Sequence, residues 1–252
     1  MATKQRRESL EMRTLEELKV KIFADGADYD GIVEMSKNPM VSGFTTNPSL
    51  IRKAGETDYE EYARRVLKAI PDKPVSFEVF ADDFPSMIKQ GRAIASWGAN
   101  VNAKIPVTNT KGESSGDVIS TLSRDGVVLN VTAIFTPAQV KAVAEALAPD
   151  TPAIVSVFAG RIADTGMDPV PLMIECLEIL QSRPRAELLW ASTREFVNIY
   201  QANDMGCHII TSPNEFIKKL SLVGKDLNDY SRETVQAFYK DATESKFSIR
   251  TD

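Results

Sequence analysis

Short runs rich in β-branched and aromatic residues alternate with longer amphipathic runs over most of the chain. Runs of the first kind are typical of β-strands, because such residues pack well on a pleated, partly buried surface. The chain has eight of them, which cover residues 20–25, 41–47, 75–81, 101–107, 127–133, 153–160, 187–192 and 208–212.

The amphipathic runs between these strands predict helices, and several follow a turn signal or carry proline in the first turn. Clear examples cover residues 59–70, 85–97, 137–147, 169–180 and 194–203. About eight strand–helix units in one chain predict a closed (β/α)8 barrel of the TIM type. An open doubly wound sheet is the alternative, and it is disfavoured because neither a GxGxxG nor a GxxxxGKS/T phosphate loop occurs.

The ends of the chain do not follow the strand–helix pattern. Residues 1–19 are highly charged with irregularly spaced apolar positions, and we expect a helical extension ahead of the first strand. We expect the barrel to cover residues 20–223, and residues 224–252 to form a C-terminal helix and tail. With no linker rich in glycine, serine or proline, the chain is predicted to be one domain over residues 1–252.

The amino-acid composition excludes several classes of protein. The chain of 252 residues carries 30 Lys and Arg against 35 Asp and Glu, a net charge of −5, which argues against a nucleic-acid surface but is compatible with a local cationic pocket. Cys176 and Cys207 form neither a metal pattern nor a disulfide framework, and the single histidine, His208, is expected to be structural. No apolar run approaches the roughly 20 residues of a membrane span. The basic N-terminus lacks the apolar segment of a secretory signal, so we expect a cytoplasmic protein.

Lys104 interrupts the apolar run 101–107 and is the most informative residue of the chain. Lysine is rarely buried without a partner or a task. Removal of an ammonium from water favours the neutral amine, a nucleophile that can condense with a carbonyl to form a Schiff base. The alternative is a structural lysine that reaches solvent or pairs with a carboxylate.

Polar residues recur near the ends of the other predicted strands, where a parallel barrel has its catalytic face. Alternation places Asn102 with Lys104 on one face of their strand and Asn130 with Thr132 on one face of theirs. Each has a structural alternative, such as a helix cap, an ordinary turn, a counter-charge for Lys104 or a partner for backbone groups. Their convergence favours a catalytic rim, because a barrel interior normally holds Val, Ile and Leu. The candidates are Asp25, Thr45, Thr46, Asn47, Glu78, Lys104, Asn130, Thr132 and Ser192.

Carbonyl chemistry at an amine fits these residues. Lys104 is the candidate nucleophile toward a ketose carbonyl, and the carboxyl groups of Asp25 and Glu78 are available for proton transfer. Beyond the rim, Arg161 and Arg194 follow the sixth and seventh predicted strands. Arginine offers paired donors to phosphate, and phosphate sites of this fold commonly use the late loops, although surface salt bridges are the alternative.

The chain resembles the transaldolase family from Phe23 to about Pro213. The resemblance is carried by the sequences TTNPSL at 45–50, the lysine strand, LNVT at 129–132, FAGRI at 158–162 and ASTR at 191–194. It implies a class I aldolase-type barrel without a metal or other cofactor.

The resemblance also implies a role for each matching residue. Lys104 corresponds to the Schiff-base lysine, Asp25 to the acid/base aspartate, and Glu78 and Thr132 to the pair that holds the catalytic water. It implies substrate contacts by Thr45, Thr46, Asn47, Asn130 and Phe158. It implies phosphate contacts by Arg161, Ser192 and Arg194.

Two positions separate the branches of this family. The resemblance includes fructose-6-phosphate aldolases, which typically have glutamine in place of Glu78 and tyrosine in place of Phe158, so this chain is more similar to the transferase branch. An aldolase that releases free dihydroxyacetone and a transaldolase for sulfonated sugars stay as alternatives. A sugar-phosphate-binding protein without catalysis is a third, disfavoured because Asp25, Glu78 and Lys104 are all present. The resemblance further implies small-molecule sugar phosphates as partners and a homo-oligomer.

Overall fold

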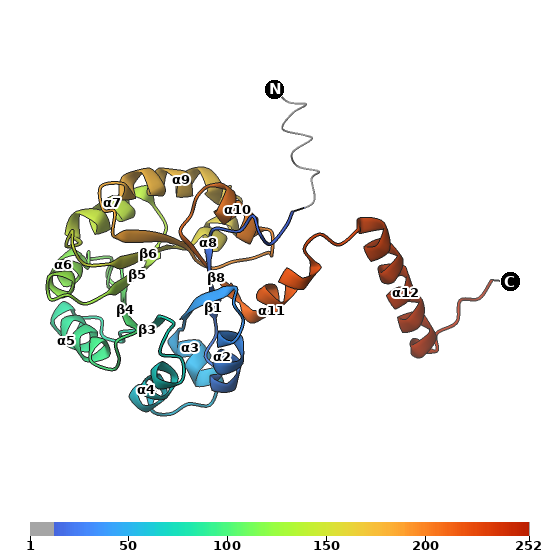
Figure 1. Cartoon of the computed structure of the whole chain (residues 1–252), viewed down its shortest axis with the longest axis horizontal. Helices are drawn as coiled ribbons and strands as arrows, with labels where there is room; N and C mark the ends of the chain where they lie inside the picture. The colour runs from blue at the N-terminus through green and yellow to red at the C-terminus, as the bar shows by residue number, and fades with distance from the viewer. Residues whose placement is uncertain (1–12, 252) are drawn as a thin grey trace, which may run out of the picture. The chain divides into compact units, whose positions relative to one another are not determined.

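The structure is a computed structural model that describes residues 13–251. Eight parallel strands close into a barrel in chain order, and helices ring them on the outside (Figure 1). The predicted (β/α)8 barrel is therefore confirmed, and all eight predicted strands are present. The strands are β1 (Lys21–Asp25), β2 (Val41–Thr45), β3 (Val75–Glu78), β4 (Val101–Pro106), β5 (Leu129–Ile134), β6 (Ala153–Val157), β7 (Ala186–Trp190) and β8 (Ile209–Pro213).

A helix follows every strand, and many of these helices begin after a residue whose side chain can cap a helix N-terminus. Side chains of Asp28, Asn47, Asp58, Asp83, Thr136 and Asp168 cap helix N-termini by accepting backbone N–H groups. The helices of the barrel unit are α2 (Tyr29–Ser36), α3 (Pro48–Lys53), α4 (Tyr59–Ala69), α5 (Phe84–Ala95), α6 (Gly116–Arg124), α7 (Pro137–Ala146), α8 (Ala159–Ala163), α9 (Pro169–Leu180), α10 (Asn198–Asp204) and α11 (Asn214–Ile217).

Several predicted boundaries were wrong, and two of them lie beside predicted site residues. The helix predicted from Arg194 begins only at Asn198, because the Asn198 Oδ1 atom accepts the N–H groups of Arg194 and Glu195 (both 2.9 Å) and holds them in a turn. The strand predicted to reach residue 160 ends at Val157, and α8 starts at Ala159. Both differences lie at the ends of β6 and β7, beside the predicted anion site.

The chain divides into two units. The barrel unit is Leu18–Lys218, and the second unit consists of the chain ends up to Glu17 and from Lys219. A 3-10 helix (Lys218–Leu222) leads to α12 (Leu227–Ser245), which confirms the predicted C-terminal helix. The N-terminal helix is not found over residues 13–20, where Thr14 bonds the Glu17 carboxylate in a turn, and residues 1–12 lie outside the described part.

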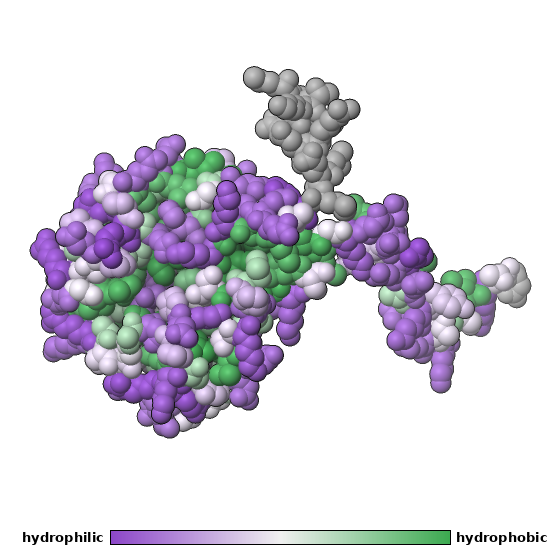
Figure 2. Space-filling view, in the orientation of Figure 1, coloured by the Kyte–Doolittle hydropathy of each residue, from purple (hydrophilic) through white to green (hydrophobic). Residues whose placement is uncertain are grey.

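The barrel interior has an apolar half and a polar half. Phe23, Ile154, Leu189, Ala191 and Ile209 form one cluster from β1 and β6–β8. Buried Ser76, Asn102 and Asn130 come from β3–β5. On the face drawn in Figure 2, hydrophobic residues of this unit gather toward the middle and hydrophilic ones toward the periphery. The catalytic candidates Asp25 and Lys104 therefore extend from different halves of the interior.

Candidate active site

A cavity of about 930 Å³ lies at the carboxyl ends of the strands. All predicted site residues except Thr46 line it, so tertiary structure brings together side chains from seven strands or the loops after them. The residues that line it are Asp25, Thr45, Asn47, Glu78, Lys104, Asn130, Thr132, Phe158, Arg161, Ser192 and Arg194, and Lys53 of α3 joins them.

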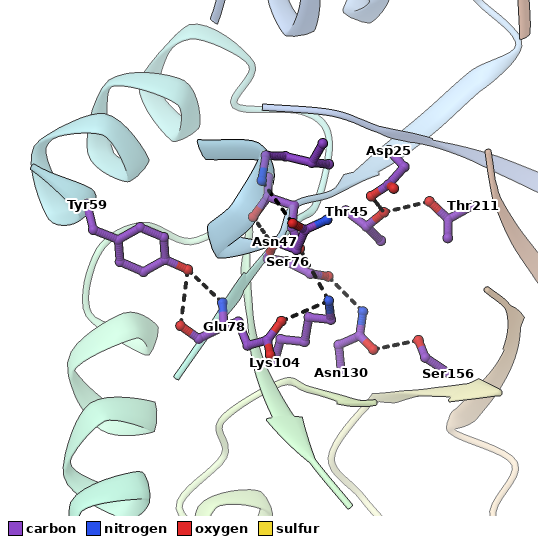
Figure 3. A network of polar contacts seen from close by, with 12 residues as sticks. Asp25, Thr45, Asn47, Tyr59, Ser76, Glu78, Lys104, Asn130, Ser156 and Thr211 are labelled. Atoms are coloured by element: carbon purple, nitrogen blue, oxygen red, sulfur yellow. Dashed lines mark hydrogen bonds and ion pairs between the residues drawn. The ribbon is translucent and has the colours of Figure 1, made fainter. Parts of the chain in front are cut away.

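Lys104 lies beside Glu78 inside the barrel (Figure 3). The two residues are register partners on β4 and β3, and Lys104 Nζ is 3.0 Å from Glu78 Oε2. The Lys104 ammonium also donates to the backbone carbonyl of Thr46 (3.3 Å), and its side chain is only 12% exposed. The carboxylate that balances the lysine charge is thus also close enough to accept its proton.

Tyr59 of α4 holds the backbone of Glu78. The Glu78 N–H donates to Tyr59 Oη (2.7 Å), and the Tyr59 hydroxyl donates to the Glu78 carbonyl (3.1 Å). The ring packs against Phe77, Phe80 and Trp97, and burial raises the pKa of Tyr59, so the phenol keeps its proton. Sequence reasoning missed Tyr59, because it occupies a helix outside the barrel and gives no local signal.

Asp25 ends β1 and lies beside Thr45, its register partner on the adjacent strand β2. Thr45 Oγ1 donates to Asp25 Oδ1 (2.8 Å) and contacts Thr211 Oγ1 (2.6 Å). Burial raises the pKa of Asp25, while the Thr45 hydrogen bond and the Lys104 charge oppose that rise. A carboxyl group whose pKa is shifted toward neutrality suits proton transfer in both directions.

Asn130 is fixed from both sides by serines that the sequence did not single out. Ser156 Oγ donates to Asn130 Oδ1 (2.7 Å), and Asn130 Nδ2 donates to Ser76 Oγ (2.9 Å). This arrangement leaves one Asn130 N–H for a ligand. Alternation offered a signal, because Ser76 shares a strand face with Glu78.

Thr132 shares the inner face of β5 with Asn130 and lines the cavity. Its Oγ1 atom is buried without a hydrogen-bond partner among residues 13–251. A buried hydroxyl normally finds a partner, so the site suits a polar group of a ligand or a water beside Thr132. Adjacent Ala133 has a left-handed backbone (φ 61°) where the β5–β6 register shifts, which is a strained conformation for a residue with a side chain.

The side-chain oxygens of Thr46 and Asn47 form hydrogen bonds with backbone groups. The Thr46 hydroxyl donates to the Ser76 carbonyl (2.8 Å), and Thr46 is the one predicted site residue that does not line the cavity. The contribution of Thr46 is its carbonyl, which accepts from Lys104. Asn47 Oδ1 caps α3 by accepting from the Leu50 N–H (2.9 Å), and Asn47 lines the cavity.

Two arginines, Arg161 and Arg194, line the cavity. The Arg161 guanidinium lies 5.2 Å from the centre of the Phe158 ring. Arg194 binds Asp164 through two hydrogen bonds, Nε to Oδ1 at 2.8 Å and Nη2 to Oδ2 at 2.5 Å. The salt bridge considered from the sequence thus exists, and it uses only one edge of the guanidinium. The Nη1 group of Arg194 takes no part in this salt bridge.

Gly160 allows the segments that carry these arginines to lie close together. A Cβ atom at Gly160 would lie 1.5 Å from the Ser192 carbonyl oxygen and 3.2 Å from Arg194 Cγ. Ser192 itself is left-handed (φ 67°). The start of α8 and the loop after β7 can approach each other only because residue 160 has no side chain, and this approach sets the positions of Arg161, Ser192 and Arg194.

Two negative findings concern the described residues alone. Within residues 13–251, no group of three or more His, Cys, Asp and Glu side chains is arranged to hold a metal ion. None of the helices in that range is both long enough and apolar enough to cross a membrane.

The fold and the site define a (β/α)8-barrel enzyme whose cavity combines an amine, two carboxyl groups and paired arginines. The sequence profile of the family described as Transaldolase/Fructose-6-phosphate aldolase matches residues 22–250. A probable transaldolase of Clostridium acetobutylicum is 35% identical over 224 residues, which cover 88% of this chain and 99% of that protein. A probable transaldolase of Methanococcus maripaludis is 35% identical over 202 residues, which cover 80% and 89%. The chain belongs to this family, as its sequence indicated.

More distant solved structures share the fold. A putative lyase/mutase from Burkholderia cenocepacia has a TM-score of 0.58 at 13% identity, covering 95% of this chain and 86% of that one. Dihydrodipicolinate synthase from Rhodopseudomonas palustris has a TM-score of 0.54 at 14% identity, covering 92% and 82%. At these identities the similarity concerns the barrel alone.

Proposed function

We propose that this protein is a transaldolase that transfers a dihydroxyacetone unit from a ketose phosphate to an aldose phosphate. The donor is fructose 6-phosphate or sedoheptulose 7-phosphate, and the unit is carried as a Schiff base on Lys104. The observation that carries the proposal is the position of Lys104 Nζ, 3.0 Å from Glu78 Oε2 in the cavity that Asp25 also lines.

The proposed reaction begins when Glu78 accepts a proton from the Lys104 ammonium. The neutral amine attacks C2 of the ketose, and loss of one water gives an iminium ion. Asp25 then takes the proton of the C4 hydroxyl while the C3–C4 bond breaks. The bond's electron pair passes to the iminium, which becomes an enamine, and the first aldose leaves.

The second half runs in reverse. The enamine attacks the aldehyde carbon of the acceptor, and the proton held by Asp25 goes to the new hydroxyl group. Addition of one water then releases the product and restores the amine. Glu78 and Thr132, whose buried hydroxyl has no hydrogen-bond partner among the described residues, are proposed to place this water, and Asn47 and Asn130 to supply N–H donors for the sugar hydroxyls.

The phosphate of the sugar is proposed to bind Arg161, Ser192 and Arg194. Support comes from the shared location of these residues in the lining of the cavity. Arginine binds phosphate through paired N–H groups, so the edge of Arg194 that Asp164 leaves open is suited to this contact.

Borohydride trapping tests the mechanism. Reduction in the presence of fructose 6-phosphate is expected to attach the three-carbon unit to Lys104, detected by mass spectrometry. Lys53→Met is the matched control, because Lys53 lines the same cavity without a contact to Glu78 in the described structure. It should keep the adduct, whereas Lys104→Met should lose it. An adduct on another residue, or none at all, contradicts the proposal.

A dihydroxyacetone-releasing aldolase is the first alternative. Glu78 and Phe158 favour the transferase, because related aldolases are expected to have glutamine and tyrosine there. The two activities separate when product formation is measured with and without an acceptor aldose. Free dihydroxyacetone formed at the same rate without acceptor would favour the aldolase.

A transaldolase for a sulfonated ketose is the second alternative, since a sulfonate can use the same arginines. The two activities are distinguished by kcat/KM, measured with 6-deoxy-6-sulfofructose and with fructose 6-phosphate as donor. A higher value for the sulfonated donor would favour this alternative. Sugar-phosphate binding without turnover of any donor would favour a protein that has lost catalysis.

We also propose a homo-oligomer in which α12 contributes to the contact. Leu227, Tyr230 and Phe238 recur on one face of α12, and no side chain of α12 is buried within the described residues. Light scattering should show a smaller particle for Phe238→Ser and an unchanged one for Gln236→Ser on the opposite face. An unchanged mass for both variants, or a monomeric wild type, contradicts this contact.

A further inference from the structure

We infer that Thr211 of β8 is a positioning residue that sets the acid/base behaviour of Asp25 through the hydroxyl of Thr45. This inference rests on the proposed function, in which Asp25 transfers protons. Three side chains from adjacent strands meet in the interior: Thr211 on β8, Asp25 on β1 and Thr45 on β2 (Figure 3). Thr211 Oγ1 is 2.6 Å from Thr45 Oγ1, which is 2.8 Å from Asp25 Oδ1.

The direction of this chain follows from the carboxylate. An ionised carboxylate only accepts hydrogen bonds, so the single proton of the Thr45 hydroxyl must point at Asp25. The hydrogen bond between the two threonines then has to come from Thr211. A hydroxyl that accepts a hydrogen bond becomes a better donor, so Thr211 strengthens the bond from Thr45 to the carboxylate.

The same chain can serve the protonated acid. Each hydroxyl both donates and accepts, so when Asp25 carries a proton it can donate to Thr45, which can donate to Thr211. Apolar side chains of equal size offer neither arrangement. Paired hydroxyls therefore fit a carboxyl group that gives and takes a proton in one catalytic cycle.

Packing alone gives no reason for a hydroxyl at this position. The neighbouring side chains Phe23 and Ile209 belong to the apolar half of the barrel, where valine has the same shape as threonine. Thr211 is 7% exposed and Thr45 is 4% exposed, so solvent does not replace the bond between them. Thr193 Oγ1 donates to the Thr211 carbonyl (2.7 Å) and holds the strand in place independently of the Thr211 side chain.

The charged groups around Asp25 come from several elements. Lys104 on β4 acts directly on the Asp25 carboxyl, and Glu78 on β3 pairs with Lys104. Lys53 on α3, Arg161 on α8 and Arg194 after β7 line the same cavity. None of these charges changes in a Thr211 variant, so a change in the titration of Asp25 reports on the hydroxyl chain.

The test compares the wild type with Thr211→Val, which keeps the shape without the hydroxyl, and Thr211→Ser, which keeps the hydroxyl. We measure the pH dependence of kcat for transfer from fructose 6-phosphate and, independently of activity, titrate the Asp25 carboxyl carbon by 13C NMR, assigned with Asp25→Asn. Loss of one polarising hydrogen bond is expected to move the acidic limb and the NMR midpoint of Thr211→Val upward by about half to one pH unit. Thr211→Ser should titrate as the wild type does.

The outcomes separate the inference from the proposed function. A Thr211→Val protein with the wild-type midpoint, or a Thr211→Ser protein shifted as far as Thr211→Val, overturns the inference. A wild type without turnover or borohydride adduct contradicts the proposed function, while the NMR midpoint still decides the role of Thr211. If Thr211→Val does not fold, Thr211→Ala replaces it with the same expected shift.

Discussion

Substitution of Gly160 tests how the proposed phosphate-binding residues Arg161, Ser192 and Arg194 are held in place. Substitution by alanine would place a Cβ atom 1.5 Å from the Ser192 carbonyl oxygen, and contacts under 3.0 Å are essentially never seen for real Cβ atoms. The atom in the way belongs to the backbone, so no rotamer change can remove the overlap. Either α8 or the loop after β7 must move.

The size of the movement sets the expected loss. The two atoms must separate by about 1.5 Å to reach even the tightest tolerable contact, which also breaks the bond from Gly160 N to the Ala191 carbonyl (3.3 Å). Overpacking of this kind costs about 1–3 kcal/mol of unfolding free energy. A shift of more than 1 Å at the residues that hold the phosphate should lower kcat/KM about 100-fold.

The assay combines stability with two donors. Urea unfolding measures the free energy, and kcat/KM is determined for fructose 6-phosphate and for fructose, which lacks the phosphate. The loss in Gly160→Ala should be much larger for the phosphorylated donor, because the displaced residues are proposed to bind that group. Gly116→Ala is the control, since its Cβ would meet only Ser114 Oγ at an ordinary 3.4 Å in the first turn of α6.

The reasoning is refuted if Gly160→Ala keeps the stability and both kcat/KM values of the wild type. Equal losses for fructose and fructose 6-phosphate would instead show that these loops do not bind the phosphate. Gly116→Ala should change kcat/KM for neither donor, and its unfolding free energy should change by less than about 1 kcal/mol.

Three further predictions concern Asp25, Tyr59 and Ala133. Burial raises the pKa of Asp25, so the native protein binds the proton of this carboxyl group more tightly than the unfolded chain does. The stability that the protonated carboxyl group contributes is fully present below the pKa of the unfolded chain. It is lost as the pH rises through the pKa of the native protein. Asp25→Asn should therefore raise the melting temperature more at pH 7 than at pH 3, and an equal change at both would contradict the burial effect. Tyr59→Phe removes both bonds to the Glu78 backbone and should cost about 1–3 kcal/mol in urea unfolding and lower kcat; unchanged values would show that the ring contacts alone hold this region. Ala133→Gly relieves a left-handed alanine (φ 61°) and should raise the unfolding free energy measured in urea by about 1 kcal/mol, and an unchanged or lower value would show that this residue is not strained.

Much of the rim that lines the cavity was predictable from local sequence. Strand alternation is a property of the backbone, so Asn130 and Thr132 had to share a face once their run formed a strand. The order of strand–helix units then predicted the barrel, and the barrel placed strand ends on one rim. This is why Lys104, Asp25 and Glu78 were found without a structure.

The supporting residues were not predictable in this way. Tyr59 reaches Glu78 from a helix, and Gly160 matters only because the Ser192 carbonyl lies against it. The bond from the Thr46 hydroxyl to the Ser76 carbonyl on the neighbouring strand was not predicted either, for a related reason. Each of these contacts joins elements that the sequence separates.

The sequence by itself determined the strands, their inward faces and the identity of the reactive groups, because these depend on residue type and spacing. Only the tertiary structure decided which of these groups form hydrogen bonds with each other. Closing the barrel sets β8 next to β1 and brings Thr211 within 2.6 Å of Thr45, although 166 positions separate them in the chain. Hydrogen bonds depend on distances of a few tenths of an ångström, and spacing along a chain does not contain that information.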